Sequence, residues 1–374
     1  MPISIKKVYG SWQARVRWTD TNGKRHSKSK NGFKTKALAR QWGNDLETKV
    51  NQGIDIKKEI SFLNYYNQWV ITYKEPKLSS KTLNRYTVVG NILQKHFKQT
   101  NIKNITRTMY QEFINSYGSN HAISSVKKLN SIIRSCVKSA ILDDYLTKDF
   151  TQRVTLTADK SKTLEVQYPN VNEIKKILNQ TINGMTDRRY TSRYMIITAI
   201  YTGMRKEEIQ ALTWNDIDFL HDTIKIDKAW RETKDKGESN SHFITHRFKP
   251  TKNKASIRQI KVNHKLIRIL SRLKINATSN LVFMDQFGTI PTSGPLNDKL
   301  REIMAELNIK KENFHFHSLR HSHVALLLAN GIDTYAISRR LGHNDITTTI
   351  NTYAYLIDEY KNKSDKDILK ALDF

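Results

Sequence analysis

Apolar and polar side chains alternate strictly near the start of the chain, and this pattern predicts a small β-sheet. Along residues 12–18 the apolar side chains fall on one face of a strand, while Arg15 and Arg17 fall on the other. Residues 3–8 and the basic run 24–30 have the length and composition of flanking strands. The pattern therefore predicts three strands with one apolar and one basic face.

A turn and a helix complete this first unit. Asn22-Gly23 is typical of a hairpin turn, because both residues accept the positive φ that such turns require. Thr35 is placed to cap a helix that runs to about Lys49. We expect residues 1–53 to form one domain, in which the inner side of the helix carries Ala37, Leu38, Trp42 and Leu46.

The pattern changes to a helical period across residues 59–158, where apolar residues recur every three or four positions. Linkers at residues 52–58 and 155–167 flank this region. We expect an all-α domain of four or five helices, which include residues 60–73, 80–97, 106–117 and 123–142.

Helical and strand patterns are mixed in the last region, residues 165–374. Asn170 can cap a helix over residues 171–182, and the apolar run 194–201 predicts a buried helix that ends at Thr202-Gly203. Strands are expected at residues 216–219, 223–226 and 256–262, and the final third is helical. The predicted fold is multidomain: a small three-stranded β-sheet plus helix, an all-α domain, and a mixed, mainly α domain with small antiparallel sheets.

Charge indicates the class of partner. The 374 residues carry a formal net charge of +28, with 12 basic and 3 acidic residues in 1–53 and 16 basic and 7 acidic in 59–163. A basic excess along the whole length favours a polyanion that touches every part of the chain, and nucleic acid fits better than a membrane surface. The alternative is a charge that serves only solubility.

The basic side chains of two predicted elements are candidates for phosphate contacts. A solvated face is the alternative in both cases. On the sheet they are Arg15, Arg17, Lys24, Arg25 and Lys28, and on the helix over residues 123–142 they are Lys127, Lys128 and Arg134.

Composition also sets limits on location and covalent structure. No run approaches the roughly 18 apolar residues of a membrane span, and the first residues lack an apolar signal region, so we expect a cytoplasmic protein. The single cysteine, Cys136, excludes an intramolecular disulfide and a zinc site built from cysteines.

A set of cationic side chains in the last region suggests chemistry on a phosphate. Arg205 follows the Thr202-Gly203 break at the start of a short helix, and Glu208, three positions on, can hold its guanidinium. A surface arginine–glutamate pair is the alternative. Lys252 lies before a predicted strand and can act as a general acid, although Lys254 or Lys261 could do the same.

Histidines and a second arginine follow. His317 and Arg320 are one helical turn apart and share a face. His317 and His321 also have the i, i+4 spacing of metal ligands, but no nearby carboxylate completes such a site and Arg320 would repel a cation, so we expect none. His343 follows a helix stop at Leu341-Gly342, where a structural histidine is the alternative.

Tyr353, ten residues after His343, is the candidate nucleophile, and Tyr355 competes for that role. A phenol with a pKa of about 10 needs cations nearby to react at neutral pH. Two arginines, a lysine and two histidines ahead of one tyrosine are what phosphoryl transfer to a tyrosine requires.

In their order along the chain, these segments resemble the tyrosine recombinases, and specifically phage-type and conjugative-element integrases. The matching text is Thr202-Gly203-Met204-Arg205-Lys206-Glu207-Glu208, Lys252, His317-Ser318-Leu319-Arg320-His321-Ser322, Leu341-Gly342-His343 and Thr348-Thr349-Ile350-Asn351-Thr352-Tyr353. One departure is Tyr355, where many members of the family have histidine.

The resemblance implies a role for each matching residue. Arg205 and Arg320 would clamp the scissile phosphate, with Glu208 in the buried acidic position beside the first arginine. Lys252 would be the general acid and His317 would assist proton transfer. His343 would stabilise the phosphorane, and Tyr353 would form a 3′-phosphotyrosyl link.

The resemblance also implies partners and a domain plan: an arm-type DNA-binding domain at 1–53, a core-binding domain at 59–158 and a catalytic domain at 165–374. It implies recombination of double-stranded DNA by a homotetramer without cofactors, to integrate and excise a bacterial mobile element. It leaves open whether an excisionase and a host DNA-bending protein take part. The tail from Leu356 to Phe374 is expected to pack on a neighbouring subunit, or else on its own domain. The alternatives in function are a type IB topoisomerase-like enzyme and a catalytically idle DNA-binding regulator.

Overall fold

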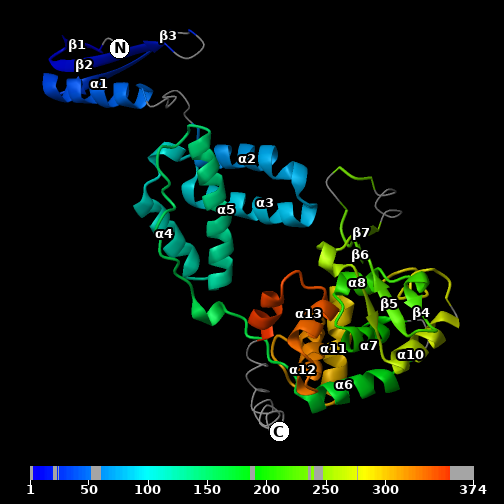
Figure 1. Ribbon diagram of the computed structural model, residues 1–374. Helices are drawn as coiled ribbons and strands as arrows, with labels where there is room; N and C mark the ends of the chain where they lie inside the picture. Colours follow the sequence, from blue (N-terminus) through cyan, green and yellow to red (C-terminus); the bar gives the residue numbers. More distant parts are fainter. Residues whose placement is uncertain are drawn as a thin grey trace, which may run out of the picture. The chain divides into compact units, whose positions relative to one another are not determined.

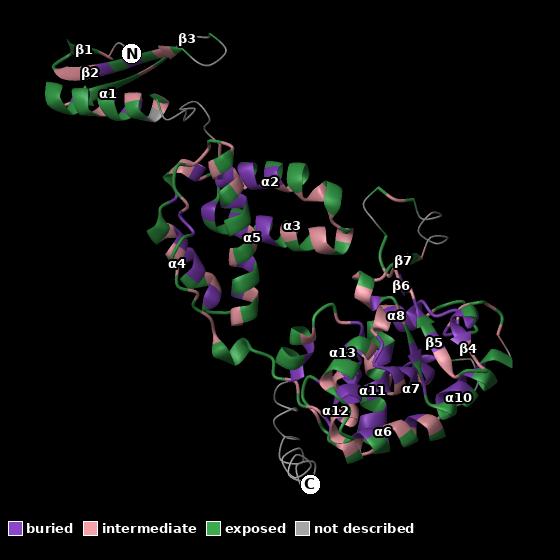
Figure 2. Cartoon of the chain, viewed as in Figure 1, coloured by how far each residue is buried: buried purple, intermediate pink, exposed green. Residues whose placement is uncertain are grey.

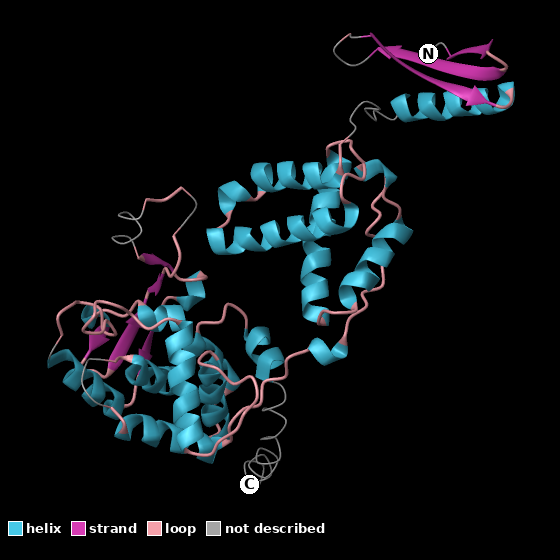
Figure 3. Cartoon of the chain, turned by 180° about the vertical axis from the view of Figure 1, so that it is seen from behind, coloured by secondary structure: helices cyan, strands magenta, loops and turns pink. Residues whose placement is uncertain are grey.

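The computed structural model divides into two compact units, Met1–Thr163 and Leu164–Phe374. Figure 1 traces the elements along the chain, and Figure 3 separates the helices from the strands. No helix in the described part of the chain is long and apolar enough to cross a membrane. The structure describes residues 3–19, 23, 25–51, 60–185, 190–234, 237–239, 247–275 and 277–353.

An antiparallel sheet of order β1-β2-β3 opens the chain, as predicted. Its strands are β1 (Ile3–Val8), β2 (Ser11–Thr19) and β3 (Arg25–Phe33), and helix α1 (Lys36–Asn51) covers one face. The side chains of Ala14 and Val16 on β2 are fully buried. The apolar face predicted for residues 12–18 is therefore confirmed, because its side chains pack against α1.

The buried side of α1 differs from the prediction. The Thr35 hydroxyl accepts a hydrogen bond from the Leu38 N–H, as expected of a capping residue. Ala37 and Leu38 are nevertheless exposed, and the side facing the sheet carries Ala39, Gly43 and Leu46.

A close approach of α1 to β1 sets this orientation. A Cβ on Gly43 would lie 2.8 Å from Cγ2 of Ile3, so only glycine allows the helix backbone to come this near. The apolar residues Ala37 and Leu38 belong to the first turn, which lies outside that contact.

Strand register divides the basic side chains of the sheet. Arg15 pairs with Ser29, and Arg25 pairs with Thr19, so Arg15, Arg17 and Arg25 share the face away from α1. Lys28 pairs with Val16 and lies on the α1 side. The expectation of one shared basic face is therefore wrong for Lys28, and Lys24 lies outside the described residues.

Four helices form the next part of the chain: α2 (Phe62–Tyr73), α3 (Ser80–Phe97), α4 (Arg107–Gly118) and α5 (Ile123–Leu142). They agree with the predicted helices to within two residues, because each has a clear apolar stripe. Aromatic side chains of α2 fill much of the core, where Trp69 Nε1 donates to Ser139 Oγ at 2.9 Å. Lys127, Lys128 and Arg134 are exposed on α5, so they are free to meet a polyanion.

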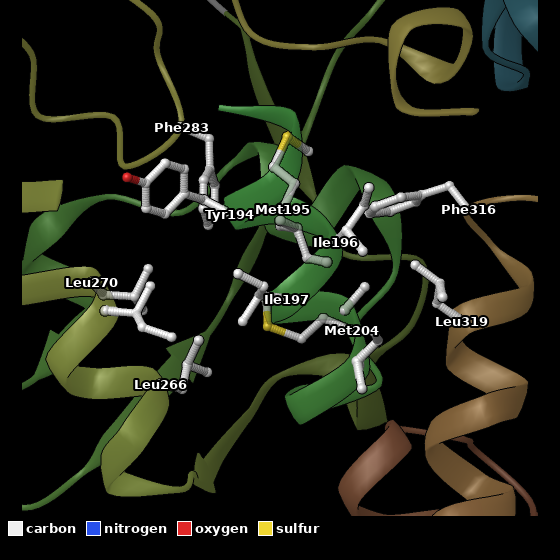
Figure 4. Packing of buried hydrophobic residues seen from close by; sticks show 14 of the residues in the cluster. Tyr194, Met195, Ile196, Ile197, Met204, Leu266, Leu270, Phe283, Phe316 and Leu319 are labelled. Atoms are coloured by element: carbon white, nitrogen blue, oxygen red, sulfur yellow. The ribbon is translucent and has the colours of Figure 1, made fainter. Parts of the chain in front are cut away.

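The second unit contains a buried central helix, α7 (Ser192–Thr202), in which nine of the eleven residues are buried. Figure 4 shows its side chains Met195, Ile196 and Ile197 among residues from several other elements. The helices around it are α6 (Val171–Asn183), α8 (Lys206–Gln210), α10 (His264–Ile275), α11 (Ser293–Glu306), α12 (Ser318–Ala329) and α13 (Thr334–Leu341). Figure 2 shows how this burial concentrates in the interior of the unit.

Two small antiparallel sheets complete this unit, as expected for a mainly α domain. One has the order β4-β5-β8, with β4 (Ile217–Asp218), β5 (Thr223–Ile226) and β8 (Arg258–Lys261), and the other pairs β6 (Lys228–Trp230) with β7 (Phe248–Pro250). Strand β8 begins two residues later than predicted because Lys254–Ser256 form a 3-10 turn. The division into three domains with limits 1–53, 59–158 and 165–374 stays a prediction.

Truncating the centre of α7 should destabilise the second unit. Ile197 is fully buried, so Ile197→Ala is expected to lower the free energy of unfolding by about 2–5 kcal/mol through lost contacts and a cavity. The control is Leu220→Ala, at a residue that is 84% exposed, with an expected change within about 0.5 kcal/mol. Calorimetry of the whole chain measures both, and equal effects would contradict a core centred on α7.

Candidate active site

The chain turns sharply between α7 and α8 and brings Arg205 to Glu208. Gly203 ends α7 with φ 64°, where a Cβ would lie 2.6 Å from Cδ2 of His323. Arg205 then directly precedes α8 as its N-cap residue. Its Nη1 donates to Glu208 Oε1 at 2.8 Å, and its backbone N–H donates to Glu208 Oε2 at 3.0 Å. The predicted Arg205–Glu208 pair is therefore present.

Glu208 also binds a second guanidinium, which the sequence did not single out. Arg258, on β8, donates from Nη2 to Glu208 Oε2 at 3.0 Å, and the two side chains are only 7% and 3% exposed. Arg258 further donates from Nε to the carbonyl of Arg340 at 2.7 Å and from Nη1 to the carbonyl of Ser256 at 2.8 Å. One carboxylate thus connects α8, β8 and, through Arg258, the end of α13.

The charge of Glu208 follows from these contacts. Burial alone would raise its pKa, but the positive charges and hydrogen bonds of Arg258 and Arg205 outweigh that effect and hold the pKa below its usual range. Glu208 is therefore an anion at neutral pH, and it stabilises two arginines that would otherwise repel each other.

Arg320, on α12, is almost fully buried and makes three hydrogen bonds. Its Nη1 donates to the carbonyl of Gly203 at 2.5 Å, and its Nη2 donates to the carbonyl of Leu341 at 2.8 Å and to His343 Nε2 at 3.0 Å. Burial, and then the charge of Arg205, lower the pKa of Arg320 to about 9. Arg320 therefore holds the end of α7 against the end of α13. A bound anion would stabilise its buried positive charge.

The position of His343 depends on a turn at Gly342, which has φ 69°. A Cβ there would meet the Ala255 carbonyl and the Arg258 side chain at 3.0 Å, so only glycine fits without displacement. Burial, and then the charges of Arg320, Arg205 and Arg258, lower the pKa of His343 to about 4. The imidazole is neutral at physiological pH.

Hydrogen bonds fix the tautomer of this neutral ring. A guanidinium can only donate, so His343 Nε2 is the acceptor of the bond from Arg320 and Nδ1 carries the proton. Nδ1 lies 2.7 Å from Thr349 Oγ1, to which it donates.

Tyr353 is in the same neighbourhood. It is the last residue of the described helix 346–353, is 1% exposed, and packs in a cluster with Val324, Ile337 and Leu341. Its ring centroid lies 5.0 Å from that of His321. Burial raises the pKa of the phenol to about 12, and the positive charge of Arg320 acts in the opposite direction. The structure therefore places the tyrosine of its own chain in the field of the arginines, whereas Tyr355 lies outside the described residues.

His317 and Lys252 lie at the surface. His317 directly precedes α12 and is exposed. Partial desolvation of its ring, and then the charges of Arg320 and His315, lower its pKa. Lys252 is exposed on the segment between β7 and β8. The hydrogen bonds given above hold Arg205, Arg320 and His343 in place, and neither Lys252 nor His317 takes part in them.

Charge balance shows what the site can bind. The guanidiniums of Arg205, Arg258 and Arg320 face one carboxylate, Glu208, so the site has an excess of about two positive charges. Within the described residues, no group of three or more His, Cys, Asp or Glu side chains could hold a metal ion. A phosphate diester, which carries one negative charge, would offset part of this excess.

Arg258 and Thr349 organise the site but were not predicted as site residues from the sequence. Arg258 shares a face of β8 with the buried Ile260, and a charge on a buried face requires a partner, so that signal was available. Thr349 stands in a run of three threonines, and only its burial singles it out.

Removing the shared carboxylate should cost stability in a pH-dependent way. Glu208→Gln leaves the buried Arg258 and the half-buried Arg205 without their anion and should lower the free energy of unfolding at neutral pH by about 3–5 kcal/mol. Because the folded-state pKa is lowered, the Glu208 contribution is present above the ordinary glutamate pKa of about 4.3 and is lost as pH falls through the folded value. Denaturation of both proteins from pH 7 to pH 3 measures the difference, which should shrink toward acid.

The matched control is Glu207→Gln. Glu207 pairs with Lys249 at the surface, where the side chains are 29% and 39% exposed, so its loss should cost about 0–1 kcal/mol. Equal stability of the two variants at neutral pH would show that Glu208 does not hold the site together.

Comparison with known proteins agrees with this geometry. Residues 169–359 match the phage integrase family, and residues 4–50 match the arm DNA-binding domain. The integrase of Staphylococcus phage L54a is 26% identical over 361 residues, which cover 88% of this chain and 98% of that protein. The ICEBs1 integrase of Bacillus subtilis strain 168 is 26% identical over 313 residues, covering 78% of this chain and 76% of that protein.

Solved structures share the fold. The Tn1549 transposon integrase in complex with transposon right end DNA has a TM-score of 0.67 at 17% identity and covers 83% of this chain and 100% of its own. A lambda integrase tetramer bound to a Holliday junction has a TM-score of 0.57 at 15% identity, with 93% and 97% covered. Arg205, Arg320, His343 and Tyr353 all lie within the stretch that matches a known family, and the chain belongs to the phage integrase family of tyrosine recombinases.

Proposed function

We propose that this chain is a site-specific DNA recombinase that cuts and rejoins duplex DNA through a 3′-phosphotyrosyl intermediate on Tyr353. Its biological task would be to integrate and excise a bacterial mobile element. The observation that carries the proposal is the burial of the Tyr353 phenol in the field of Arg320 and Arg205 of the same chain. A site with excess positive charge and one tyrosine is suited to a phosphate diester and to a covalent bond with it.

In the proposed first step, the Tyr353 oxygen attacks the scissile phosphorus. A bond forms between that oxygen and phosphorus, and the bond from phosphorus to the 5′ oxygen of the next nucleotide breaks. The phenol is protonated at neutral pH because its pKa is about 12, so it must give up its proton as the new bond forms. His317, whose pKa is lowered, is neutral and can accept that proton.

The leaving 5′ oxygen needs a proton, and Lys252 is the proposed donor. It is exposed on the segment between β7 and β8, where it can reach DNA bound over the site. A mobile donor held in place only by bound DNA would restrict cleavage to the assembled complex.

The arginines have the proposed task of stabilising the phosphorane. Arg205 has 23% of its side chain exposed, so it can reach a phosphate while Glu208 holds its Nη1. Arg320 reaches from the other side, and His343 lies beside it at 3.0 Å. In the second step a 5′ hydroxyl of a partner strand attacks the phosphotyrosine, and the phenol regains its proton. The phosphotyrosyl bond keeps the energy of the cleaved phosphodiester bond, so resealing needs no nucleotide cofactor.

Exchange of two strands at two sites needs four active sites, and we propose a homotetramer on DNA. The fold shared with lambda integrase, which was solved as a tetramer on a Holliday junction, supports this. The match of residues 4–50 to an arm DNA-binding domain supports DNA contacts by Arg15, Arg17 and Arg25, and exposure supports contacts by Lys127, Lys128 and Arg134. The packing of the tail after Leu356 falls outside the described residues.

Trapping a covalent adduct tests the nucleophile. A suicide DNA substrate with a nick near the cleavage site loses its 5′ fragment, so the phosphotyrosyl adduct accumulates with the wild-type protein. Tyr353→Phe removes the attacking oxygen and should abolish the adduct, seen as loss of the shifted band in a denaturing gel. Tyr355→Phe is the control and should keep it.

An adduct that persists in Tyr353→Phe would refute the nucleophile. Recombination between two paired sites, assayed with the same protein, separates a recombinase from an enzyme that only relaxes DNA. Failure to form any adduct would leave only a DNA-binding regulator.

A change of leaving group tests Lys252. Lys252→Ala should slow cleavage by about 10²- to 10⁴-fold, because the 5′ oxygen leaves without a proton. A substrate with sulfur in place of the bridging 5′ oxygen should restore the rate, since a thiolate leaves unprotonated. Lys254→Ala, two residues away and also exposed, is the control and should cleave both substrates as the wild type does. A defect that sulfur does not rescue would assign Lys252 to binding.

A further inference from the structure

The buried hydroxyl of Thr349 has no part in the proposed chemistry, yet it contacts the site directly. Thr349 is 1% exposed, and its Oγ1 lies 2.7 Å from His343 Nδ1. Thr347 and Thr348, its two neighbours, are exposed. Of the three threonines in a row, only this one is enclosed by the protein and joined to a site residue.

Helical geometry links Thr349 to the nucleophile. Thr349 and Tyr353 are four residues apart in the helix 346–353, so they lie on the same face, one turn apart. Both are buried there. A contact made by Thr349 therefore fixes the rotation and height of the turn that carries Tyr353.

A chain of hydrogen bonds continues from Thr349 to the arginine clamp. His343 Nδ1–H donates to Thr349 Oγ1, which leaves Nε2 as the acceptor for Arg320 Nη2 at 3.0 Å. The opposite tautomer would place an N–H against the N–H of the guanidinium. The donor-only guanidinium of Arg320 sets this tautomer, and the Thr349 hydroxyl, by accepting from Nδ1–H, holds the ring in the orientation that presents Nε2 to Arg320.

A neighbouring histidine shows the same arrangement with a different partner. His323 Nδ1 lies 2.8 Å from the carbonyl of Ile200, and its Nε2 accepts from Arg340 Nε at 3.0 Å. There the acceptor is a backbone carbonyl of α7. For His343 the acceptor is a side chain on the helix of the nucleophile, so the bond exists only when that helix is docked.

We infer that Thr349 is a positioning residue for this site: through His343 it aligns Arg320 when, and only when, the helix of Tyr353 is in place. The inference rests on the proposed function for its consequence, which is that the phosphate clamp and the nucleophile are assembled together. It assigns no proton transfer to Thr349.

Cleavage kinetics of Thr349→Val and Thr349→Ser test the inference. Valine has nearly the same shape but no hydroxyl, and serine keeps the hydroxyl. Thr349→Val should slow adduct formation at saturating DNA by about 10- to 100-fold, because misplaced reacting groups cost about this much. DNA affinity should stay within about twofold, and Thr349→Ser should return the rate to within a few-fold of the wild type. Thr348→Val, at the adjacent exposed position, is the matched control and should cleave normally.

A spectroscopic measurement separates loss of the hydrogen bond from Nδ1–H from general loosening. In protein with nitrogen-labelled histidine, the His343 resonances, assigned by their absence from His343→Gln, should report a protonated Nδ1 in the wild type and in both variants, because Arg320 still donates to Nε2. In Thr349→Val alone the Nδ1 proton should lose its hydrogen-bond partner, seen as an upfield shift of its resonance and faster exchange with water. Arg320, Arg205, Arg258 and His321 are the charged and titratable groups around the ring, and none of them is changed.

The outcomes are distinct. Normal cleavage by Thr349→Val, or equal impairment of the valine and serine variants, would overturn the inference. An Nδ1 proton in Thr349→Val with the same shift and exchange rate as in the wild type would also overturn it. If the wild type forms no adduct, the proposed function fails, and the measurement on the Nδ1 proton still decides whether Thr349 positions His343.

Discussion

A single buried carboxylate makes the site possible. Three guanidiniums cannot share a small volume away from water unless an anion offsets their repulsion, and burial of an unpaired charge costs several kcal/mol. Glu208 meets this requirement by accepting from Arg205 and Arg258 at the same time. The remaining positive charge is what a DNA phosphate would neutralise, so the same imbalance that limits stability creates affinity.

Backbone turns bring these side chains together. Arg320 donates to the carbonyls of Gly203 and Leu341, which lie at the ends of α7 and α13. The two glycines that end those helices, Gly203 and Gly342, have left-handed backbone and no room for a Cβ. Arg320 can therefore hold both ends only because each helix stops where it does. Arg340 adds a further link, since it donates to the carbonyls of Lys261 and Tyr201.

Tyr353 and the arginines of the site are connected rather than independent. Tyr353 packs on α12 and α13 residues, and Thr349 on the same helix binds His343, which binds Arg320. Lys252 has the opposite character, because it is exposed and stands apart from this network. The hydrogen-bonded arginines thus form one part of the site, and the exposed Lys252 lies outside their network.

The sequence by itself determined most of the elements and the family. Local periodicity was enough for β1, α3 and α5, whose predicted limits match, and the order of the motifs was enough for the family. It did not determine which face of an element is buried. Ala37 and Leu38 were placed wrongly because the close contact of Gly43 with Ile3 orients α1, and the register of β3 moved Lys28 to the α1 side. Only the tertiary structure identified the partners of Arg258 and Thr349. Arg258 binds a carboxylate 50 residues away, and no local pattern encodes that contact. Thr349 is near His343 in the chain, but the turn at Gly342 and the burial of Thr349 decide that the two side chains meet.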